Sequence, residues 1–201
     1  MRITVENLSC ERGGRTVFSN QSFALESGEF LQLAGPNGSG KSSLLRLLAN
    51  LGEPSQGRIT LEGGSSELTL GQQAHYIAHS DASKSALTVT ENLRFWRDFL
   101  GGGDLTRALD ALNLGPLAAY PVALLSAGQK RRLALARLAL VPRIIWLLDE
   151  PSVGLDDASQ RLLVALMREH LKAGGLILAA THVPLGLDPQ MKLHLDGKGQ
   201  A

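Results

Sequence analysis

The sequence predicts an α/β fold built around a parallel β-sheet, and three apolar runs indicate it. Residues 30–34 lead directly into a glycine-rich loop and a helical pattern, while residues 144–148 and 176–180 flank another helical pattern. Buried parallel strands read as nearly continuous apolar runs, and the helices between them cover the faces of the sheet. We therefore expect a parallel core sheet that contains these three strands.

The N-terminal part of the chain has a different pattern. Its first thirty residues alternate polar and apolar side chains and are interrupted by turns at Gly13–Gly14 and Ser27–Gly28. Residues 58–61 read as a further strand. Alternation with a period of two is typical of strands that bury one face only. This pattern predicts a small antiparallel β subdomain beside the parallel core.

The stretch from about residue 83 to residue 140 is mainly helical in character. We expect one helix to begin near Thr90 or Asn92, a flexible break at residues 101–103, and a second helix capped by Asp104. We therefore expect a single domain over residues 1–201, with a helical subdomain inserted at about residues 83–140.

Composition excludes several classes of function. The 201 residues carry 20 Lys and Arg against 19 Asp and Glu, without the basic excess that nucleic-acid binders show. The densest basic cluster, Lys130–Arg132, lies within a helical pattern. The single cysteine, Cys10, excludes an intrachain disulfide. The apolar runs are far shorter than the ~20 residues of a membrane-spanning helix, so we expect membrane contact only through partner subunits.

A phosphate-binding loop is predicted at residues 35–42, which match G-x-x-x-x-G-K-[ST] between an apolar strand and a helix. In such a loop, backbone N–H groups and the helix N-terminus bind phosphate oxygens. Lys41 supplies a charge to the β- and γ-phosphates, and the Ser42 hydroxyl is suited to Mg²⁺. An ordinary glycine-rich turn is the alternative, which the flanking strand and helix disfavour. The predicted ATP-binding residues of the loop are Gly35, Pro36, Asn37, Gly38, Ser39, Gly40, Lys41, Ser42 and Ser43.

Two acidic residues follow the apolar run at 145–148. Asp149 stands at the carboxyl end of a strand, where its carboxylate can enter the coordination sphere of Mg²⁺. Glu150 can act as the general base that polarises the attacking water. A strand that simply ends at a solvated acidic turn is common, but the phosphate-binding loop upstream favours a site that hydrolyses a nucleotide.

The run Leu125–Gln129, Leu-Ser-Ala-Gly-Gln, resembles the Leu-Ser-Gly-Gly-Gln signature of ABC transporter ATPases, with Ala127 in place of a glycine. The resemblance implies a P-loop NTPase of the ABC ATPase fold, whose RecA-like core carries the antiparallel and helical subdomains. It also implies a homodimer that sandwiches ATP, in which Ser126, Gly128 and Gln129 of one subunit contact the γ-phosphate held by the other. Ser126 also reads as a simple helix cap, and the two roles are compatible.

Two further residues match the same family. Asp156, at the end of the run Ser152–Asp156, resembles the D-loop that crosses to the partner subunit. His182 follows the apolar run at 176–180 and resembles the switch histidine that bridges the γ-phosphate and Glu150. A lone histidine after a strand is more often structural, but its place in this ordered set of motifs favours the catalytic role.

Two positions depart from the general family pattern. His79 stands where the Q-loop glutamine is expected, which would bring an imidazole toward the metal and the attacking water. Arg12 stands where a tyrosine often stacks on adenine, and a guanidinium plane can stack in the same way. The alternatives are a polar loop residue without an active-site contact at His79 and a solvated turn charge at Arg12.

Both departures, together with Trp146 in the strand before Asp149, resemble the ATP-binding subunits of cytochrome c maturation haem transporters. That resemblance implies a peripheral protein on the cytoplasmic face of the bacterial inner membrane, with integral membrane subunits resembling CcmB and CcmC. It also implies that ATP turnover drives haem handling, export or release of a haem-loaded chaperone. The run Ser152–Leu155 departs from the pattern expected of that group.

Three other functions remain open on the sequence. The chain could serve an ABC transporter with another cargo, a soluble ABC ATPase of translation or repair, or a nucleotide-binding module without activity. Soluble members usually carry tandem cassettes or long insertions, and the presence of Glu150 and His182 disfavours an inactive module.

An aromatic cluster in the helical stretch gives a hypothesis about the membrane partner. Phe95, Trp96 and Phe99 lie close together in a chain that is only 4% aromatic. Aromatic anchors in a partly exposed groove are typical of binding hot spots, so we expect these residues, together with residues 79–87 and Leu93, to contact a membrane subunit. The alternative is that they pack inside the helical subdomain.

Overall fold

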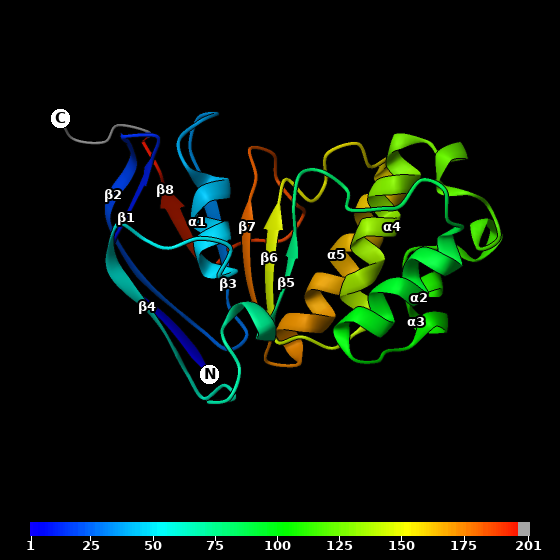
Figure 1. The fold of residues 1–201 in the computed structure, drawn as a ribbon, viewed down its shortest axis with the longest axis horizontal. Coiled ribbons are helices and arrows are strands. Elements are labelled where there is room, and N and C mark those ends of the chain that lie inside the picture. Colours follow the sequence, from blue (N-terminus) through cyan, green and yellow to red (C-terminus); the bar gives the residue numbers. More distant parts are fainter. Residues whose placement is uncertain (197–201) are drawn as a thin grey trace.

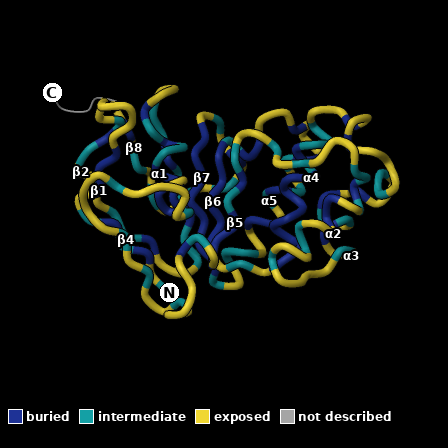
Figure 2. The backbone as a smooth tube through the Cα atoms, in the orientation of Figure 1, coloured by how far each residue is buried: buried dark blue, intermediate teal, exposed yellow. Residues whose placement is uncertain are grey.

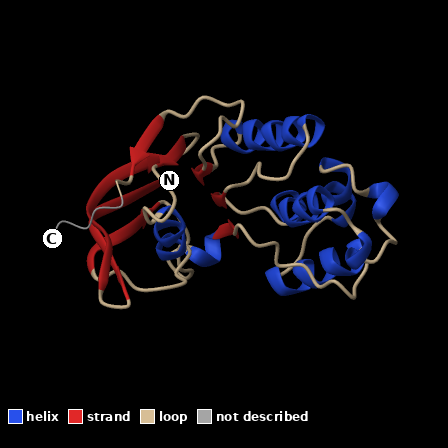
Figure 3. Cartoon of the chain, turned by 90° about the horizontal axis from the view of Figure 1, so that it is seen from above, coloured by secondary structure: helices blue, strands red, loops and turns tan. Residues whose placement is uncertain are grey.

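A computed structural model describes residues 1–196 and stacks their helices and strands in layers (Figures 1 and 3). An antiparallel sheet lies at one end, helix α1 (Lys41–Leu48) lies between it and a parallel sheet, and the other α-helices lie beyond the parallel sheet (Figure 1). This arrangement is the α/β fold with two kinds of sheet that the sequence predicts. Within residues 1–196, none of the helices combines the length and the apolar character that a membrane crossing requires.

The antiparallel sheet consists of β1 (Arg2–Arg12), β2 (Arg15–Glu26) and β4 (Gln56–Glu62), in the order β2-β1-β4. Gly13 and Gly14 join β1 to β2 with φ angles of 55° and 72°. A two-residue hairpin turn with two positive φ angles follows the natural twist of the strands, and glycine adopts it without strain. Strand β4 is longer than the predicted residues 58–61. Register shifts let β1 bend while it stays paired with both neighbours.

The parallel sheet has the order β5-β6-β7-β3-β8, and every neighbouring pair is parallel. Its strands are β3 (Phe30–Ala34), β5 (Ala74–Ile77), β6 (Ile145–Asp149), β7 (Leu176–Ala180) and β8 (Met191–His194). Every residue of β6 and β7 is buried, which explains their continuous apolar sequences. The prediction placed β6 one residue too early, because Asp149 still pairs with Ala180 and so belongs to the strand.

Two apolar cores lie on opposite faces of the parallel sheet (Figure 2). In the first, α1 (Lys41–Leu48) buries four leucines between the two sheets. In the second, α4 (Ala127–Leu140) and α5 (Asp157–Lys172) pack beside the sheet, and α2 (Val89–Leu100) and α3 (Leu105–Ala111) pack against α4. Helices α2, α3 and α4 all lie within residues 83–140, although the boundaries of a separate helical subdomain stay a prediction.

The start of α2 differs from the prediction at Thr90 or Asn92. Thr88 caps the helix instead, because its hydroxyl accepts from the Glu91 backbone N–H at 3.2 Å while the Glu91 carboxylate accepts from the Thr88 N–H at 2.8 Å. Asn92 is buried, and its side-chain amide donates to the carbonyl of Lys84 at 3.0 Å, which ties down the preceding loop. The predicted cap of α3 by Asp104 is confirmed.

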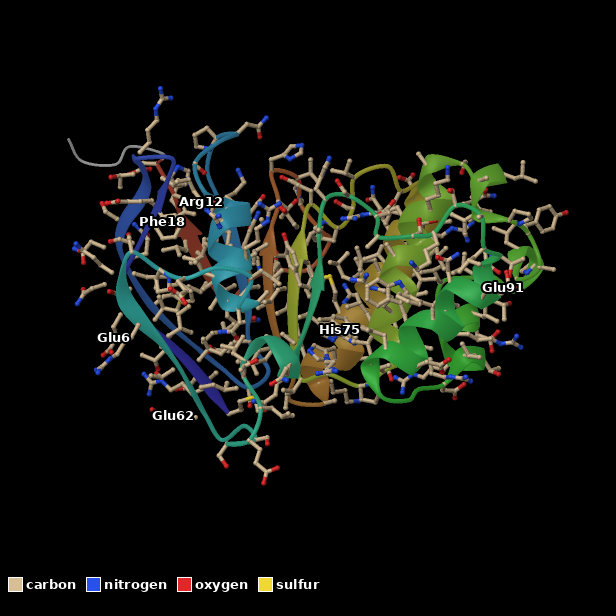
Figure 4. The ribbon with its side chains drawn as sticks, viewed as in Figure 1. Glu6, Arg12, Phe18, Glu62, His75 and Glu91 are labelled. Atoms are coloured by element: carbon tan, nitrogen blue, oxygen red, sulfur yellow. The ribbon has the colours of Figure 1, made fainter. Side chains whose placement is uncertain are left out.

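A histidine lies inside the second core. His75 is on β5, which carries it between the sheet and the helices (Figure 4), and its Nε2 donates to the Val141 carbonyl at 2.7 Å. Burial, opposed by this hydrogen bond and assisted by nearby Arg137 and Arg143, lowers its pKa from 6.5 to about 4. Because the unfolded chain binds this proton at a higher pH than the folded chain, His75 destabilises the fold progressively as the pH falls from about 6.5 to about 4.

We therefore expect His75→Gln to flatten the pH dependence of unfolding. Glutamine keeps a donor for the Val141 carbonyl but does not titrate, so the acid-dependent loss, on the order of 3 kcal/mol for one such shift, should shrink. The measurement is urea denaturation of both proteins between about pH 7 and pH 4.5. His194→Gln, which removes an exposed histidine, is the control and should keep the wild-type slope. Parallel slopes for wild type and His75→Gln would contradict the assignment.

Candidate nucleotide site

The carboxyl ends of the parallel strands bring most of the predicted site residues to one edge of the sheet. The segment after β3 is the glycine-rich loop, and the residue two past the end of β5 is His79. Asp149 and Glu150 stand at the end of β6, and His182 stands just after β7. Because all four strands point the same way, these segments meet in the crevice where α/β sheets bind ligands.

The phosphate-binding loop is shaped by glycines and lies close to the antiparallel sheet. Gly38 and Gly40 have φ angles of 80° and 100°, and Gly40 immediately precedes α1. A Cβ atom on Gly40 would lie 2.8 Å from side-chain atoms of both Val17 and Phe18, so a larger residue would push β2 away. The loop therefore needs glycine at position 40 for its conformation and for its contact with the hairpin.

Lys41 is held inside this loop. It is the first residue of α1 and is buried, and its Nζ donates to the carbonyl oxygens of Gly35 and Pro36, each at 2.8 Å. A buried ammonium needs such acceptors because it has left water. The loop thus holds a positive charge at the N-terminus of α1, where the helix dipole already favours an anion.

A cleft of about 570 Å³ opens at this edge of the sheet, a size typical of small-molecule sites. Most of the predicted residues of the loop line it, together with the residues from the ends of β5, β6 and β7. The lining residues are Val17, Asn37, Gly38, Gly40, Lys41, Ser42, Ser43, His79, Asp149, Glu150, Val153 and His182. The fold thus joins segments that are far apart in the sequence into one concave site.

The acidic wall of the cleft combines a buried carboxylate with an oriented one. Asp149 is buried as the last residue of β6. Glu150 follows with a φ angle of 47°, and its backbone N–H donates to the Ala180 carbonyl at 2.8 Å. Its Oε1 lies 3.0 Å from the Nδ1 of His182, whereas its Oε2 is buried without a hydrogen-bond partner. The Glu150 carboxylate thus has one oxygen, Oε1, held by His182 and a second oxygen, Oε2, that is free to accept a proton.

The chemistry of the cleft suits Mg²⁺. Ser42 and Asp149 both line it and both offer oxygen atoms, which are the ligands that Mg²⁺ prefers. Residues 1–196 contain no group of three or more His, Cys, Asp or Glu side chains placed to hold a metal ion. One carboxylate and one hydroxyl fit an ion that takes its remaining ligands from phosphates and water.

The predicted signature lies outside the cleft. Ser126 caps α4, and its hydroxyl accepts from the Gln129 N–H at 3.2 Å while the Gln129 side chain accepts from the Ser126 N–H at 2.8 Å. Ser126 is exposed. A Cβ atom on Gly128 would lie 2.8 Å from the Gly154 carbonyl, so this glycine lets the loop after β6 approach the helix. Helix α4 therefore presents its N-terminus to solvent, away from the phosphate-binding loop of the same chain.

Comparison with known proteins places the chain in a family. The sequence profile described as ABC transporter matches residues 18–153. The chain belongs to the ABC transporter family. As an ABC ATPase it hydrolyses ATP, and it shares its fold with solved ATP-binding cassettes.

Two relatives are similar over nearly the whole chain. The cytochrome c biogenesis ATP-binding export protein CcmA of Nitrobacter winogradskyi is 57% identical over 93% of this chain and 94% of that protein. The protein of the same name from Bradyrhizobium diazoefficiens is 53% identical over 94% of this chain and 95% of its own length.

Two solved structures share the fold. The ATP-binding subunit of an ABC transporter superposes with a TM-score of 0.87 and 25% identity, over 98% of this chain and 87% of its own length. A dimeric ATP-binding cassette in a post-hydrolysis state, bound to ADP and phosphate, superposes with a TM-score of 0.79 and 23% identity, over 97% of this chain and 94% of its own length.

Other predicted contacts of the ABC site are not brought into the cleft. Arg12 is exposed on the β1–β2 hairpin beside α1, where Figure 4 shows it with Phe18, and it does not line the cleft. Asp156 caps α5, since its carboxylate accepts from the Ser159 N–H at 2.8 Å, and interaction with Ser159 lowers its pKa. The roles assigned to both residues stay predictions. Gly35, Pro36 and Ser39 belong to the loop without lining the cleft.

The sequence analysis missed two apolar residues of the cleft, Val17 and Val153. Val17 lies on β2 against the glycine that precedes α1, and Val153 lies in the loop after β6. Neither position carries a chemical signal of its own, because a valine in a strand or loop reads as packing. The signal that could have found Val17 is the alternation of β2, which places it one residue before the buried Phe18.

We expect Val17→Ser to raise the KM for ATP several-fold, on the order of 3–10, with little change in kcat. An apolar contact that is equal in the ground and transition states changes binding and leaves the chemical step alone. Steady-state ATPase kinetics measure both constants. Arg12→Ala in the same assay decides the stacking hypothesis, since a rise in KM supports it and an unchanged KM makes Arg12 a solvated turn charge. An unchanged KM for Val17→Ser would contradict the contact at Val17.

Proposed function

We propose that this chain is the ATP-hydrolysing subunit of an ABC transporter complex for cytochrome c biogenesis. In this proposal, ATP hydrolysis is coupled to haem handling or export, or to the release of a haem-loaded chaperone. The observation that carries the ATPase site is the cleft in which Lys41, Asp149 and the Glu150–His182 pair converge. The names and the high identity of the two bacterial relatives support the process it serves.

The working unit in this proposal is a homodimer. The phosphate-binding loop opens into the cleft, while Ser126 and the N-terminus of α4 lie on the surface. One chain therefore offers two separate anion-binding helix ends, and a second copy turned to face it brings α4 onto the first cleft. Similar cassettes that crystallise as dimers support this arrangement. A monomer would then lack half of each ATP site.

The chemical step assigns a role to each residue of the cleft. The N–H groups at the start of α1 and the Lys41 ammonium bind phosphate oxygens. Glu150 orients the attacking water and accepts its proton through the free Oε2, while His182 holds Oε1 in place. Ser42 and Asp149 would hold Mg²⁺, which neutralises charge on the phosphates when bound. His79 lines the same cleft and would approach the metal and water from the end of β5.

The decisive variant for the catalytic proposal is Glu150→Gln. The amide keeps the size of the side chain but cannot accept the proton of water, so kcat should fall on the order of 100-fold or more while ATP binding persists. Steady-state ATPase assays and equilibrium ATP binding measure the two effects. Near wild-type turnover would sink the assignment of the base.

The same variant tests the biological process. In a strain that lacks this chain, the wild type should restore c-type cytochromes, detected by haem staining, and Glu150→Gln should not. Normal cytochrome c levels in the deletion strain would contradict the proposed process while leaving the ATPase assignment intact.

A groove of about 320 Å³ lies between the end of β5 and helix α2, and it is the proposed docking place for a membrane subunit. Phe99 is 70% exposed and lines it. Phe95 is 40% exposed, and its ring stacks on that of Phe99 at a centroid distance of 6.2 Å. Exposed stacked aromatics beside a groove are typical of protein interfaces.

Trp96 fits both alternatives for the aromatic cluster, the docking surface and the core. It lines the groove but also packs against the second core, and the Arg137 guanidinium lies 4.2 Å from its ring centroid. The cluster is thus partly core and partly surface. Leu93 is fully buried in the second core, so the expected contact of this residue with a membrane subunit is wrong. In this proposal the occupant is an integral membrane subunit that resembles CcmB or CcmC, and the chain itself is the peripheral ATPase.

We expect Phe99→Ser to weaken association with the membrane subunit while folding and ATP binding persist, because an exposed ring contributes little to the core. Trp96→Ala should lower the melting temperature as well, since part of its area is buried. Co-purification with the membrane partner beside a thermal melt separates the effects. Leu124→Ser, which alters another exposed apolar residue away from the groove, is the control. Full binding by Phe99→Ser would contradict the docking place.

A further inference from the structure

Arg131 is a buried cation near the catalytic edge that none of the motifs explains. It lies on α4, is 4% exposed, and makes hydrogen bonds with every nitrogen of its guanidinium. Its Nε donates to the Pro151 carbonyl at 3.2 Å. Its Nη1 donates to the Ala78 carbonyl at 2.8 Å and to Asp81 Oδ1 at 3.0 Å. Its Nη2 donates to the Asp149 carbonyl at 2.9 Å and to the Glu150 carbonyl at 2.8 Å. Four of its five acceptors are therefore backbone carbonyls.

Three of these carbonyls are consecutive and belong to the turn that presents the general base. The last register pair of β6 is Asp149 with Ala180, and Arg131 donates to each of the carbonyls of residues 149–151. The Glu150 carbonyl also accepts from the Val153 N–H at 3.3 Å. Glu150 has a φ angle of 47°, a left-handed conformation that costs a residue with a side chain about 1–2 kcal/mol. A conformation of this kind persists only where its surroundings hold it.

The other two acceptors lie in the segment that follows β5, the strand beside β6. Ala78 and Asp81 belong to the segment after β5, and His79 between them lines the nucleotide cleft. The ion pair with Asp81 supplies a counter-charge for the buried guanidinium. One side chain from α4 therefore joins the segment that carries His79 to the turn that carries Glu150.

We propose that Arg131 is a positioning residue for the general base. It holds the carbonyls of residues 149–151 in the left-handed turn that directs the Glu150 carboxylate into the cleft and toward His182. This inference rests on the proposed role of Glu150 as the base. Arg131 itself does not line the cleft, so it acts on the reaction only through the backbone that it holds.

The geometry of arginine suits this task better than that of lysine. A guanidinium presents five N–H donors in a rigid plane, and here all three of its nitrogens are used. A lysine ammonium has three donors around one atom. It cannot reach both the segment after β5 and the carbonyls of residues 149–151 at once. Lysine at position 131 should therefore keep some of the carbonyl contacts and lose the others.

The test compares Arg131→Gln and Arg131→Lys with the wild-type chain. Equilibrium binding of ATP gives the Kd and the fraction of chains that bind, and ATPase assays give kcat per binding chain. We expect Arg131→Gln to lower kcat on the order of 10–100-fold, because a displaced catalytic group loses its alignment, with the Kd within about threefold. Arg131→Lys should give an intermediate kcat. Arg132→Gln is the matched control and should keep kcat, since within residues 1–196 the side chain of this neighbour donates only to the carbonyls of Leu112 and Asn113.

A second comparison separates positioning from a general structural role. If Arg131 acts through Glu150, then Arg131→Gln added to Glu150→Gln should lower the residual turnover no further. A further multiplicative fall in the double variant, or an unchanged kcat per binding chain in both single variants, overturns the proposal. If Arg131→Gln does not fold, Arg131→Lys decides alone by the same criterion on kcat. Near wild-type activity of Glu150→Gln itself would instead remove the base assignment on which the proposal rests.

Discussion

The hydrogen bond from the Glu150 backbone N–H to the Ala180 carbonyl closes the parallel ladder of β6 and β7, whose last register pair is Asp149 with Ala180. This pairing sets the positions of the two strand ends relative to each other, and His182 consequently comes within 3.0 Å of the Glu150 carboxylate. Strand β3 pairs with the other side of β7, so the phosphate-binding loop leaves the sheet at the same edge. A slip of one residue in either ladder would turn alternate side chains to the other face and would separate Glu150 from His182 and from the loop.

The backbone conformations that the cleft requires are maintained by contacts outside it. Gly40 has a φ angle of 100° and lies against Val17 and Phe18, so the antiparallel sheet backs the phosphate-binding loop. Glu150 adopts a left-handed turn whose carbonyl groups are all bound by Arg131 from α4. Strained residues are concentrated at functional sites because neighbouring structure offsets their cost. The antiparallel sheet and helix α4, which lie on either side of the parallel sheet, therefore hold the backbone of the site in place. Most of the polar side chains of the cleft come from other segments.

Much of the fold and part of the cleft could be predicted from the sequence, and the residues that escaped show why. The apolar runs of β3, β6 and β7 and the glycine-rich loop are local signals, so their positions followed directly. Strands β5 and β8 are four residues each, and β8 alternates half-buried and exposed positions at the edge of the sheet, which leaves no continuous apolar run. Arg131 read as part of a basic cluster on a helix, because its partners at residues 78–81 and 149–151 are distant in sequence and are mostly carbonyls, which every residue possesses.

Helix α4 connects the predicted signature, the Glu150 turn and the groove within one helix. Its N-terminus presents Ser126, Arg131 one turn later reaches the Glu150 turn, and Arg137 farther along stacks on Trp96 at the groove. Arg137 also donates to the Tyr76 carbonyl at 2.7 Å, so α4 is tied to the β5 segment at two points, Tyr76 and Ala78. Burial lowers the pKa of Arg137 to about 10, which leaves it charged at neutral pH and keeps its contact with the indole ring. Helix α4 is continuous from residue 127 to residue 140, so the contact with Trp96, the contacts with the Glu150 turn and the exposed end at Ser126 all come from one helix.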